Sequence, residues 1–484
     1  MLNFAFIVLA TAGGQDPQYD TLMLETGPRV DKVVARDLNG DGSPDLIVQS
    51  GRDIQVFFFE KGKGFTARPQ QIVRLDPNVF LWTFGALDGQ KFPVLFASGS
   101  RGVQTYLFDG KQFGGPRDAI VHPSIFQGAV AEGHAPVYLD FAPDLHRDGR
   151  SEVLLFQKDE LFLMRQEPGG EFRCRQKLPL PVDTTMVIPW TAHMKLSESE
   201  TVPMLAFGDL TGHGRTDIGY YRDEGIGLFE QDEKGFFKPL ENRDLTAERK
   251  KRRPNRVIQF DFPPRVEDFN GDGLLDVAVI YPSKGRVAIY YGSAGKKDFT
   301  QPDQVMQVAD GWSSGIYVEN LSGGKRHDLI MGVIRKFGLT GGIQAFLSGK
   351  VKLELHIYSM QENGTFTKDP VQELKFEAPY TFHVTRESTN LDLVFRPSFK
   401  GDFNKDGLHD LLLAADARTL HIYPGVPGKM IAQEPSGKIL MNPPPGTTMT
   451  EPFVADFNGD GVSDLVLKHV LSPEKQVLEL KLSK

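Results

Sequence analysis

The segment DFNGDGVSD, from Asp456 to Asp464, and the DLVL run that begins at its last residue decide the fold. Three other segments nearly repeat it: DLNGDGSPD from Asp37 to Asp45, DFNGDGLLD from Asp268 to Asp276, and DFNKDGLHD from Asp402 to Asp410. Each places carboxylate or amide oxygens at positions 1, 3, 5 and 9 around a glycine that permits a tight turn. A short loop of this kind wraps a hard cation that prefers oxygen ligands, such as Ca²⁺.

The four loops therefore predict about four Ca²⁺ ions. The expected side-chain ligands are Asp37, Asn39, Asp41, Asp45, Asp268, Asn270, Asp272, Asp276, Asp402, Asn404, Asp406, Asp410, Asp456, Asn458, Asp460 and Asp464. At position 7 the side chain varies, so Ser43, Leu274, Leu408 and Val462 are each expected to offer a backbone carbonyl. A fifth, weaker site is expected at Asp144, Asp148 and Glu152, because the imidazole of His146 at position 3 is a poor ligand for a hard cation.

Two other interpretations of the loops were compared with this one. An EF-hand loop needs a bidentate Glu at position 12, where this chain has Val48, Val279, Leu413 and Leu467. The apolar runs that follow each loop are instead typical of buried strands, so the loop joins two strands. A plain turn rich in Asp, Asn and Gly fits one copy. Four copies with the same ligand spacing favour a metal loop.

The loops belong to a longer repeat. Degenerate copies begin at Asp88, Asp144, Asp209 and Asn320, which gives eight units separated by 51 to 82 residues. A second signature lies out of phase with the first: an aromatic strand breaks at a Gly-containing or polar turn and resumes at Phe, as in FFFEKGKGF at 57–65. Each unit thus has an inner hairpin closed by the acidic loop and an outer hairpin closed by the Gly turn. Four antiparallel strands repeated radially make a β-propeller blade.

These motifs resemble the FG-GAP or VCBS repeat family, whose blades build the head of the integrin α-subunit. The resemblance implies that the loop between the two inner strands of a blade binds calcium. It covers nearly the whole chain from about residue 31. Integrin heads have seven blades, and seven stays the alternative here if one degenerate unit is no blade. We expect an all-β, single closed propeller of eight blades, with the segment 21–26 supplying the missing strand of the last blade.

The termini and the composition suggest an exported protein. Residues 1–12 are expected to be a signal peptide, with Ala10-Thr11-Ala12 as the cleavage site, although no Lys or Arg precedes the apolar run. The propeller then spans 13–484, outside the cytoplasm: secreted, periplasmic or at the cell surface. No other stretch approaches the roughly 20 apolar residues of a membrane span. The single cysteine, Cys174, forms no internal disulfide.

The charge of the chain bears on its partners. A formal net charge of −8 argues against a general nucleic-acid binder. The basic run at 249–256 is interpreted as a solvated linker or, alternatively, as a patch for an anionic glycan or surface.

The sequence contains no HExxH or P-loop motif, and an enzyme is therefore the less favoured interpretation. We expect a binding or adhesion module for a glycan or protein ligand. The alternatives are a calcium-dependent polysaccharide lyase, another propeller enzyme, or a structural spacer in a cell-envelope assembly. Trp82 and Trp312 precede degenerate loops at equivalent positions and are expected to lie at a ligand face, buried packing being the alternative, beside Arg265 or Arg396.

Overall fold

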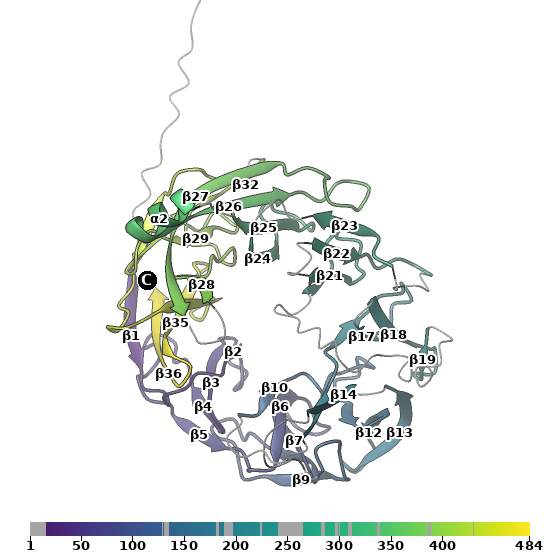
Figure 1. Ribbon diagram of the computed structural model, residues 1–484. Helices are drawn as coiled ribbons and strands as arrows, with labels where there is room; N and C mark the ends of the chain where they lie inside the picture. The colour runs from purple at the N-terminus through teal and green to yellow at the C-terminus, as the bar shows by residue number, and fades with distance from the viewer. Residues whose placement is uncertain are drawn as a thin grey trace, which may run out of the picture.

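The fold is a ring of eight antiparallel sheets arranged radially, as the computed structural model shows (Figure 1). The structure describes residues 16–484 except 128, 130–134, 181–182, 188–196, 223–224, 241–264, 282–285, 296–298, 300, 308–311, 336–338, 385–388 and 429. The expected signal peptide and the basic run at 249–256 lie outside the described residues. The all-β class and the number of eight blades are confirmed, and the alternative of seven is wrong.

Blades 1 to 7 run from their innermost to their outermost strand in chain order, and blade 8 takes its outermost strand from the N-terminal end. Blades 1 to 4 contain β2 (Lys32–Arg36), β3 (Asp45–Ser50), β4 (Asp53–Phe57) and β5 (Gln71–Arg74); β6 (Val79–Gly85), β7 (Val94–Gly99), β8 (Gly102–Tyr106) and β9 (Arg117–Val121); β11 (Val153–Phe156), β12 (Glu160–Gln166) and β13 (Phe172–Pro179); β16 (Leu205–Gly208), β17 (Asp217–Arg222), β18 (Gly225–Gln231) and β19 (Phe237–Pro239). β10 (Val137–Tyr138) adds to β6 in parallel, and β14 (Asp183–Val187) pairs with β15 (Ser197–Thr201) between blades 3 and 4.

The second half of the ring follows the same plan. Blades 5 to 8 contain β20 (Arg265–Glu267), β21 (Asp276–Tyr281), β22 (Arg286–Tyr290) and β23 (Gln304–Gln307); β24 (Trp312–Glu319), β25 (Asp328–Ile334), β26 (Lys350–Tyr358), β27 (Gln372–Val384) and β28 (Thr389–Leu393); β29 (Leu411–Ala414), β30 (Thr419–Tyr423) and β33 (Gly437–Leu440); β34 (Met449–Ala455), β35 (Asp464–Ser472), β36 (Lys475–Ser483) and β1 (Tyr19–Leu24). The pair β31 (Gly425–Val426) and β32 (Met430–Ile431) lies between β30 and β33, and the helix α2 (Leu339–Ser348) lies between β25 and β26.

The apolar runs that follow the acidic loops form the core. Every residue of β3, β11 and β29 is buried, because the strand that follows the acidic loop of a blade is covered on both faces by neighbouring blades. Each pair of neighbouring blades shares an apolar cluster. The last blade shares one with the first blade as well, since Phe57 of blade 1 packs in one cluster with Phe457 and Val466 of blade 8. Burial of each such side chain contributes about 1.5–3 kcal/mol to folding.

The N-terminal strand completes blade 8. β1 pairs with β36 in antiparallel register from Tyr19↔Ser483 to Leu24↔Leu478, two residues earlier than the segment expected from the sequence. A buried polar network supports this pairing, because Lys481 Nζ donates to Thr21 Oγ1 at 2.9 Å and lies 2.8 Å from the Glu479 carboxylate. Glu479 in turn accepts hydrogen bonds from His469 and Asn442. The first described strand and the last one are thus joined by backbone pairing and by side chains.

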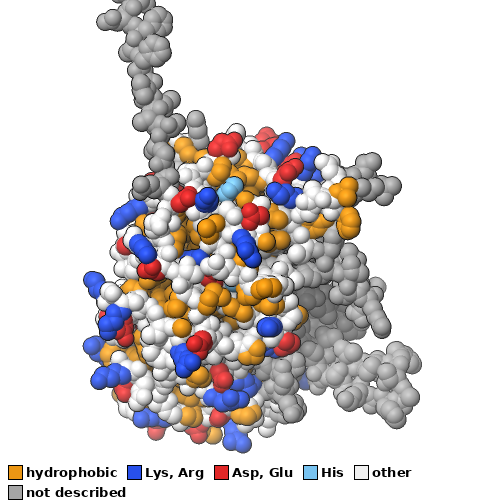
Figure 2. All heavy atoms as spheres, turned by 90° about the vertical axis from the view of Figure 1, so that its left-hand side faces the viewer, with side chains coloured by type: hydrophobic (Ala, Val, Ile, Leu, Met, Phe, Trp, Pro, Cys, Tyr) orange, Lys and Arg blue, Asp and Glu red, His pale blue; other side chains and the backbone are white. Residues whose placement is uncertain are grey.

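The outside of the ring carries mixed charge. Basic, acidic and hydrophobic side chains are interspersed over the face drawn in Figure 2. Among the described residues, no helix combines the length and the apolar character that crossing a bilayer requires.

Candidate metal loops

The four acidic loops share one backbone conformation. In each, the carboxylate at position 1 accepts the N–H groups of positions 4 and 6, as Asp37 does from Gly40 at 2.6 Å and from Gly42 at 2.9 Å. Positions 4 and 6 have positive φ, a conformation that suits glycine, and glycine occupies both positions in three of the loops. In loop 402–410 position 4 is Lys405, which has the same positive φ, 62°. The loop therefore wraps around its first carboxylate, and positions 3 and 5 lie at the surface.

The carboxylate at position 9 lies beneath the loop. Asp45, Asp276, Asp410 and Asp464 each have an exposed fraction of 0%. One oxygen accepts the N–H of position 2, and the other accepts an N–H at the end of the third strand of the blade or just beyond it, that of Phe59, Gly292, Gly425 or Ser483. Burial, with the neighbouring loop carboxylates, raises the pKa of Asp45 to about 6 and the pKa values of Asp276 and Asp410 to about 7. The raised pKa values indicate that no positive charge near these buried carboxylates compensates for their burial.

The donor set of these loops fits a hard cation. Each loop holds three Asp carboxylates and an Asn amide within nine residues. None of these twelve carboxylates forms an ion pair with a described Lys, Arg or His. Oxygen ligands of this number and charge are those that Ca²⁺ takes in proteins. The position-1 and position-5 carboxylates lie close enough to Asp45, Asp276 and Asp410 to act on their pKa values, and Ca²⁺ itself stays a prediction.

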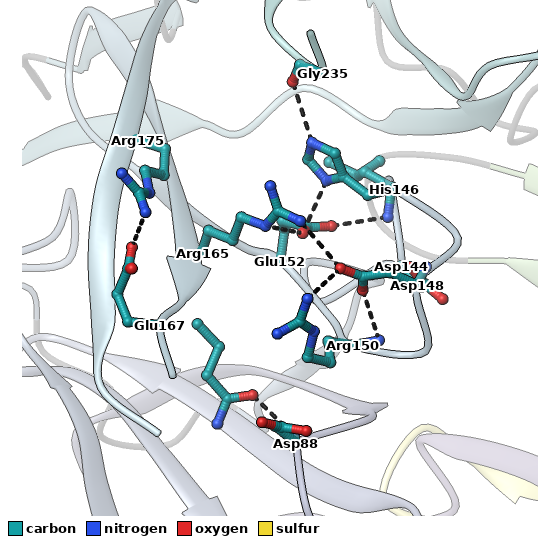
Figure 3. Close-up of polar contacts among 12 residues, drawn as sticks. Asp88, Asp144, His146, Asp148, Arg150, Glu152, Arg165, Glu167, Arg175 and Gly235 are labelled. Atoms are coloured by element: carbon teal, nitrogen blue, oxygen red, sulfur yellow. Dashed lines mark hydrogen bonds and ion pairs between the residues drawn. The ribbon is translucent and has the colours of Figure 1, made fainter. Parts of the chain in front are cut away.

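The expected fifth site does not fit a cation. In loop 144–152, Asp148 lies 2.6 Å from Arg150 and 3.0 Å from Arg165, while Glu152 lies 2.8 Å from His146 Nδ1 (Figure 3). Asp144 keeps the position-1 role and accepts N–H groups of its own loop. The protein thus supplies the positive charge from its own side chains, above all from Arg165 on β12. The sequence could not reveal this, because Arg165 lies outside the loop motif.

Contacts between neighbouring loops were not expected from the sequence. The N–H of position 8 donates to the preceding loop at several junctions: Leu275 to Asp209 O at 2.9 Å, His327 to Phe269 O at 2.9 Å and Ser463 to Asp402 O at 2.8 Å. The position-2 side chains are also anchors, since Leu38, Phe269, Phe403 and Phe457 are almost fully buried. The signal for them was present in the sequence, because position 2 is always Leu or Phe. A change in one loop is therefore transmitted to the adjacent blade.

The expected ligand face at Trp82 requires a correction. The Trp82 ring is fully buried, it packs against Phe84 and Tyr138, and its Nε1–H donates to Gln49 Oε1 at 2.8 Å. An indole that fills the junction between blades 1 and 2 and has a partner for its N–H presents no surface to a ligand. Trp312 begins β24, and its side chain lies outside the described residues.

Comparison with known proteins adds the family of one repeat. No curated protein matches the chain. Among solved structures, a lectin of Agrocybe aegerita, described as recognising non-reducing terminal N-acetylglucosamine, is 15% identical, with a TM-score of 0.42, over 84% of this chain and 94% of its own. BBS1N in complex with ARL6DN is 9% identical, with a TM-score of 0.40, over 98% of this chain and 97% of its own. A putative 6-phosphogluconolactonase of Bacteroides fragilis is 14% identical, with a TM-score of 0.34, over 88% of this chain and 98% of its own.

Residues 402–467, which include two of the four acidic loops, match the FG-GAP-like repeat family, so the chain is an eight-bladed β-propeller that carries an FG-GAP-like repeat.

Proposed function

We propose that this protein is an exported binding module: a propeller that calcium stabilises and that recognises a glycan or a protein ligand. Calcium would be held by the loops at 37–45, 268–276, 402–410 and 456–464. Extracellular modules bind Ca²⁺ with dissociation constants on the order of 10⁻⁴ to 10⁻³ M. Sites this weak fill only where calcium is abundant, and export would place the protein in such surroundings.

One contrast carries the calcium part of the proposal. In loop 144–152 the first carboxylate accepts the N–H of position 6, as in the acidic loops, yet the other carboxylates are paired with Arg150, Arg165 and His146. In blade 4, loop 209–217 has His213 in place of the position-5 carboxylate, and His213 lies 3.2 Å from Glu230. The four acidic loops keep the full set of oxygen ligands and contain no such internal cation. The four acidic loops therefore take their cation from solution.

Calcium bound to a loop stabilises more than that loop. A ligand that binds only the folded state contributes about 2.7 kcal/mol per site at a hundredfold excess over its dissociation constant. Position 9 connects the loop to the end of the third strand, and position 8 connects it to the preceding blade. The stabilisation therefore reaches the junctions between blades, which hold the ring in shape for a ligand.

The test combines stability and binding. The melting temperature of the purified protein is measured in calcium and in chelator, and the same samples are screened against a panel of glycans and polysaccharides, with binding and unsaturated-product absorbance read together. The proposal expects melting to rise with calcium, ligand binding to require it, and no unsaturated product to form. Unsaturated product would instead establish the lyase alternative. Equal melting and binding in chelator would refute the calcium-stabilised module.

A matched pair of variants separates the loops. Asp272→Asn removes a carboxylate from an acidic loop, whereas Asp148→Asn removes the equivalent carboxylate from the loop that Arg150 and Arg165 neutralise. Only the first variant should reduce the rise in melting temperature that calcium produces.

A further inference from the structure

Two neighbouring junctions of the ring carry a Glu–His contact at positions where two other junctions carry a glycine against Leu or Ser. The residue just before a loop faces position 8 of the next loop: Gly208 faces Leu275, and Gly401 faces Ser463. Between blades 5 and 6 the same two positions are Glu267 and His327, 3.8 Å apart. Between blades 6 and 7 they are Glu319 and His409, 3.9 Å apart. The junctions around blade 6 are therefore polar at a place where packing alone requires no polar group.

Glu319 is the buried member of this set. It ends β24, has an exposed fraction of 8%, and accepts no hydrogen bond from the described residues. Its nearest cations are Lys400 Nζ, 4.0 Å from Oε1, and His409 Nδ1, 3.9 Å from Oε2. Both distances exceed hydrogen-bond length by about 1 Å. His409 Nδ1 is itself buried without a hydrogen-bond partner.

Of these three side chains, His409 has the fully buried polar atom without a hydrogen-bond partner, its Nδ1, and leaving such an atom unsatisfied destabilises the unliganded protein. Burial raises the pKa of the Glu319 carboxyl to about 7, with Glu267 adding to the effect and Lys400 opposing it. Glu319 thus faces Lys400 and His409 at distances too long for direct hydrogen bonds, and a ligand oxygen beside the three groups can bond to both sides. The Lys400 and His409 side chains are 53% and 39% exposed, so a ligand can reach them from solvent.

The charges around Glu319 restrict the kind of ligand that can bind beside it. A simple anion is disfavoured by Glu319 and by Glu267, which lies close enough to affect its pKa. A simple cation is disfavoured by Lys400 and Arg265, which act on the same carboxyl. A pair of adjacent hydroxyl groups satisfies both sides, because a hydroxyl donates to a carboxylate and accepts from an ammonium or an imidazole N–H.

We propose that Glu319, Lys400 and His409 form a binding site for the vicinal hydroxyl groups of a neutral sugar. This inference rests on the proposed function as a binding module and specifies its ligand class. In the bound state a ligand hydroxyl donates to the Glu319 carboxylate, and Lys400 and His409 donate to ligand oxygens. The site lies at the inner end of the junction between blades 6 and 7, beside loop 402–410.

The test uses the calcium-loaded full chain and neutral gluco-, galacto-, manno-, xylo- and chito-oligosaccharides as probes in titration calorimetry. We expect at least one of these probes to bind. Glu319→Gln and Lys400→Met should each weaken that binding by about tenfold to a hundredfold, since a hydrogen bond to a charged group is lost. Lys400 is half-exposed, so its variant reports on the site even if Glu319→Gln impairs folding.

Glu451→Gln is the matched control. Glu451 lies on β34 of blade 8, where its carboxylate is 3.0 Å from Lys468, and its replacement should leave sugar binding unchanged. Equal affinity of the wild type, Glu319→Gln and Lys400→Met would overturn the site. Absence of binding by every neutral probe would also overturn it, while calcium-dependent binding of another ligand would leave the proposed function standing. The calcium content of each variant is measured as well. An unchanged content shows that weaker sugar binding comes from the Glu319 site and not from lost calcium in loop 402–410.

Discussion

Replacing Glu479 by glutamine tests the network that fastens the N-terminal strand to blade 8. The Glu479 carboxylate is fully buried and accepts hydrogen bonds from His469 Nε2 at 2.9 Å and from the Asn442 N–H at 2.8 Å. Lys481 Nζ lies 2.8 Å away and also donates to Thr21 on β1. A glutamine has the same size but carries no charge, so the variant leaves Lys481 buried without its counter-ion.

The pKa of Glu479 gives the magnitude. Burial acts to raise this pKa, but the hydrogen bonds from His469, Lys481 and Asn442 outweigh burial and hold it at about 2, against an ordinary value of 4.5. A depressed pKa in the folded state corresponds to about 3 kcal/mol of folding free energy. Because the folded pKa is the lower one, this stability is fully present above about pH 4.5 and is lost as pH falls towards 2.

Urea unfolding of the wild type and of Glu479→Gln at pH 7 and pH 3 measures the effect. The variant should be less stable by about 3 kcal/mol at pH 7, and the difference should fall to roughly half or less at pH 3. Glu451→Gln is the control, since its carboxylate is 26% exposed and should contribute about 0–1 kcal/mol. A difference for Glu479→Gln that is the same at both pH values would refute the reasoning.

Three further predictions concern other parts of the ring. Trp82→Ala should destabilise the protein by about 3–5 kcal/mol in urea unfolding and leave the affinity for any ligand unchanged, since Trp82 is a core residue; weaker binding with unchanged stability would contradict this. Deletion of residues 1–24 exposes the edge of β36 and should cause association in light scattering, whereas a monomer of unchanged stability would show that β1 is dispensable. Lys405→Gly should raise the melting temperature slightly, because Lys405 has φ 62° where glycine is unstrained, and a fall would contradict the assignment of strain there.

The repeat could be predicted from the sequence because local chemistry defines it. The acidic loop and its apolar strand lie within about a dozen consecutive residues, and the Gly turn that follows the third strand, bridged by Glu60↔Gly64 in blade 1, is equally local. The pairing of β1 with β36 was also predictable, because the last unit had room for only one more strand.

What the sequence could not predict depends on contacts between distant residues. Arg165 neutralises a loop from another strand, and Gln49 satisfies the N–H of Trp82 from another blade. The Glu319 site combines β24 with residues of the following blade. The helix α2 and the long hairpin of β27 and β28 do not recur in the other blades, so the repeat pattern could not predict them.

The calcium content of the purified protein tests the central claim most directly. After equilibrium dialysis against calcium well above the dissociation constant, elemental analysis should find about four ions per chain. Asp406→Asn should lower that number by one, and Asp148→Asn should leave it unchanged, because Arg150 and Arg165 already neutralise Asp148. No bound calcium in the wild type, or an equal loss in both variants, would contradict the assignment of the four acidic loops as the metal sites.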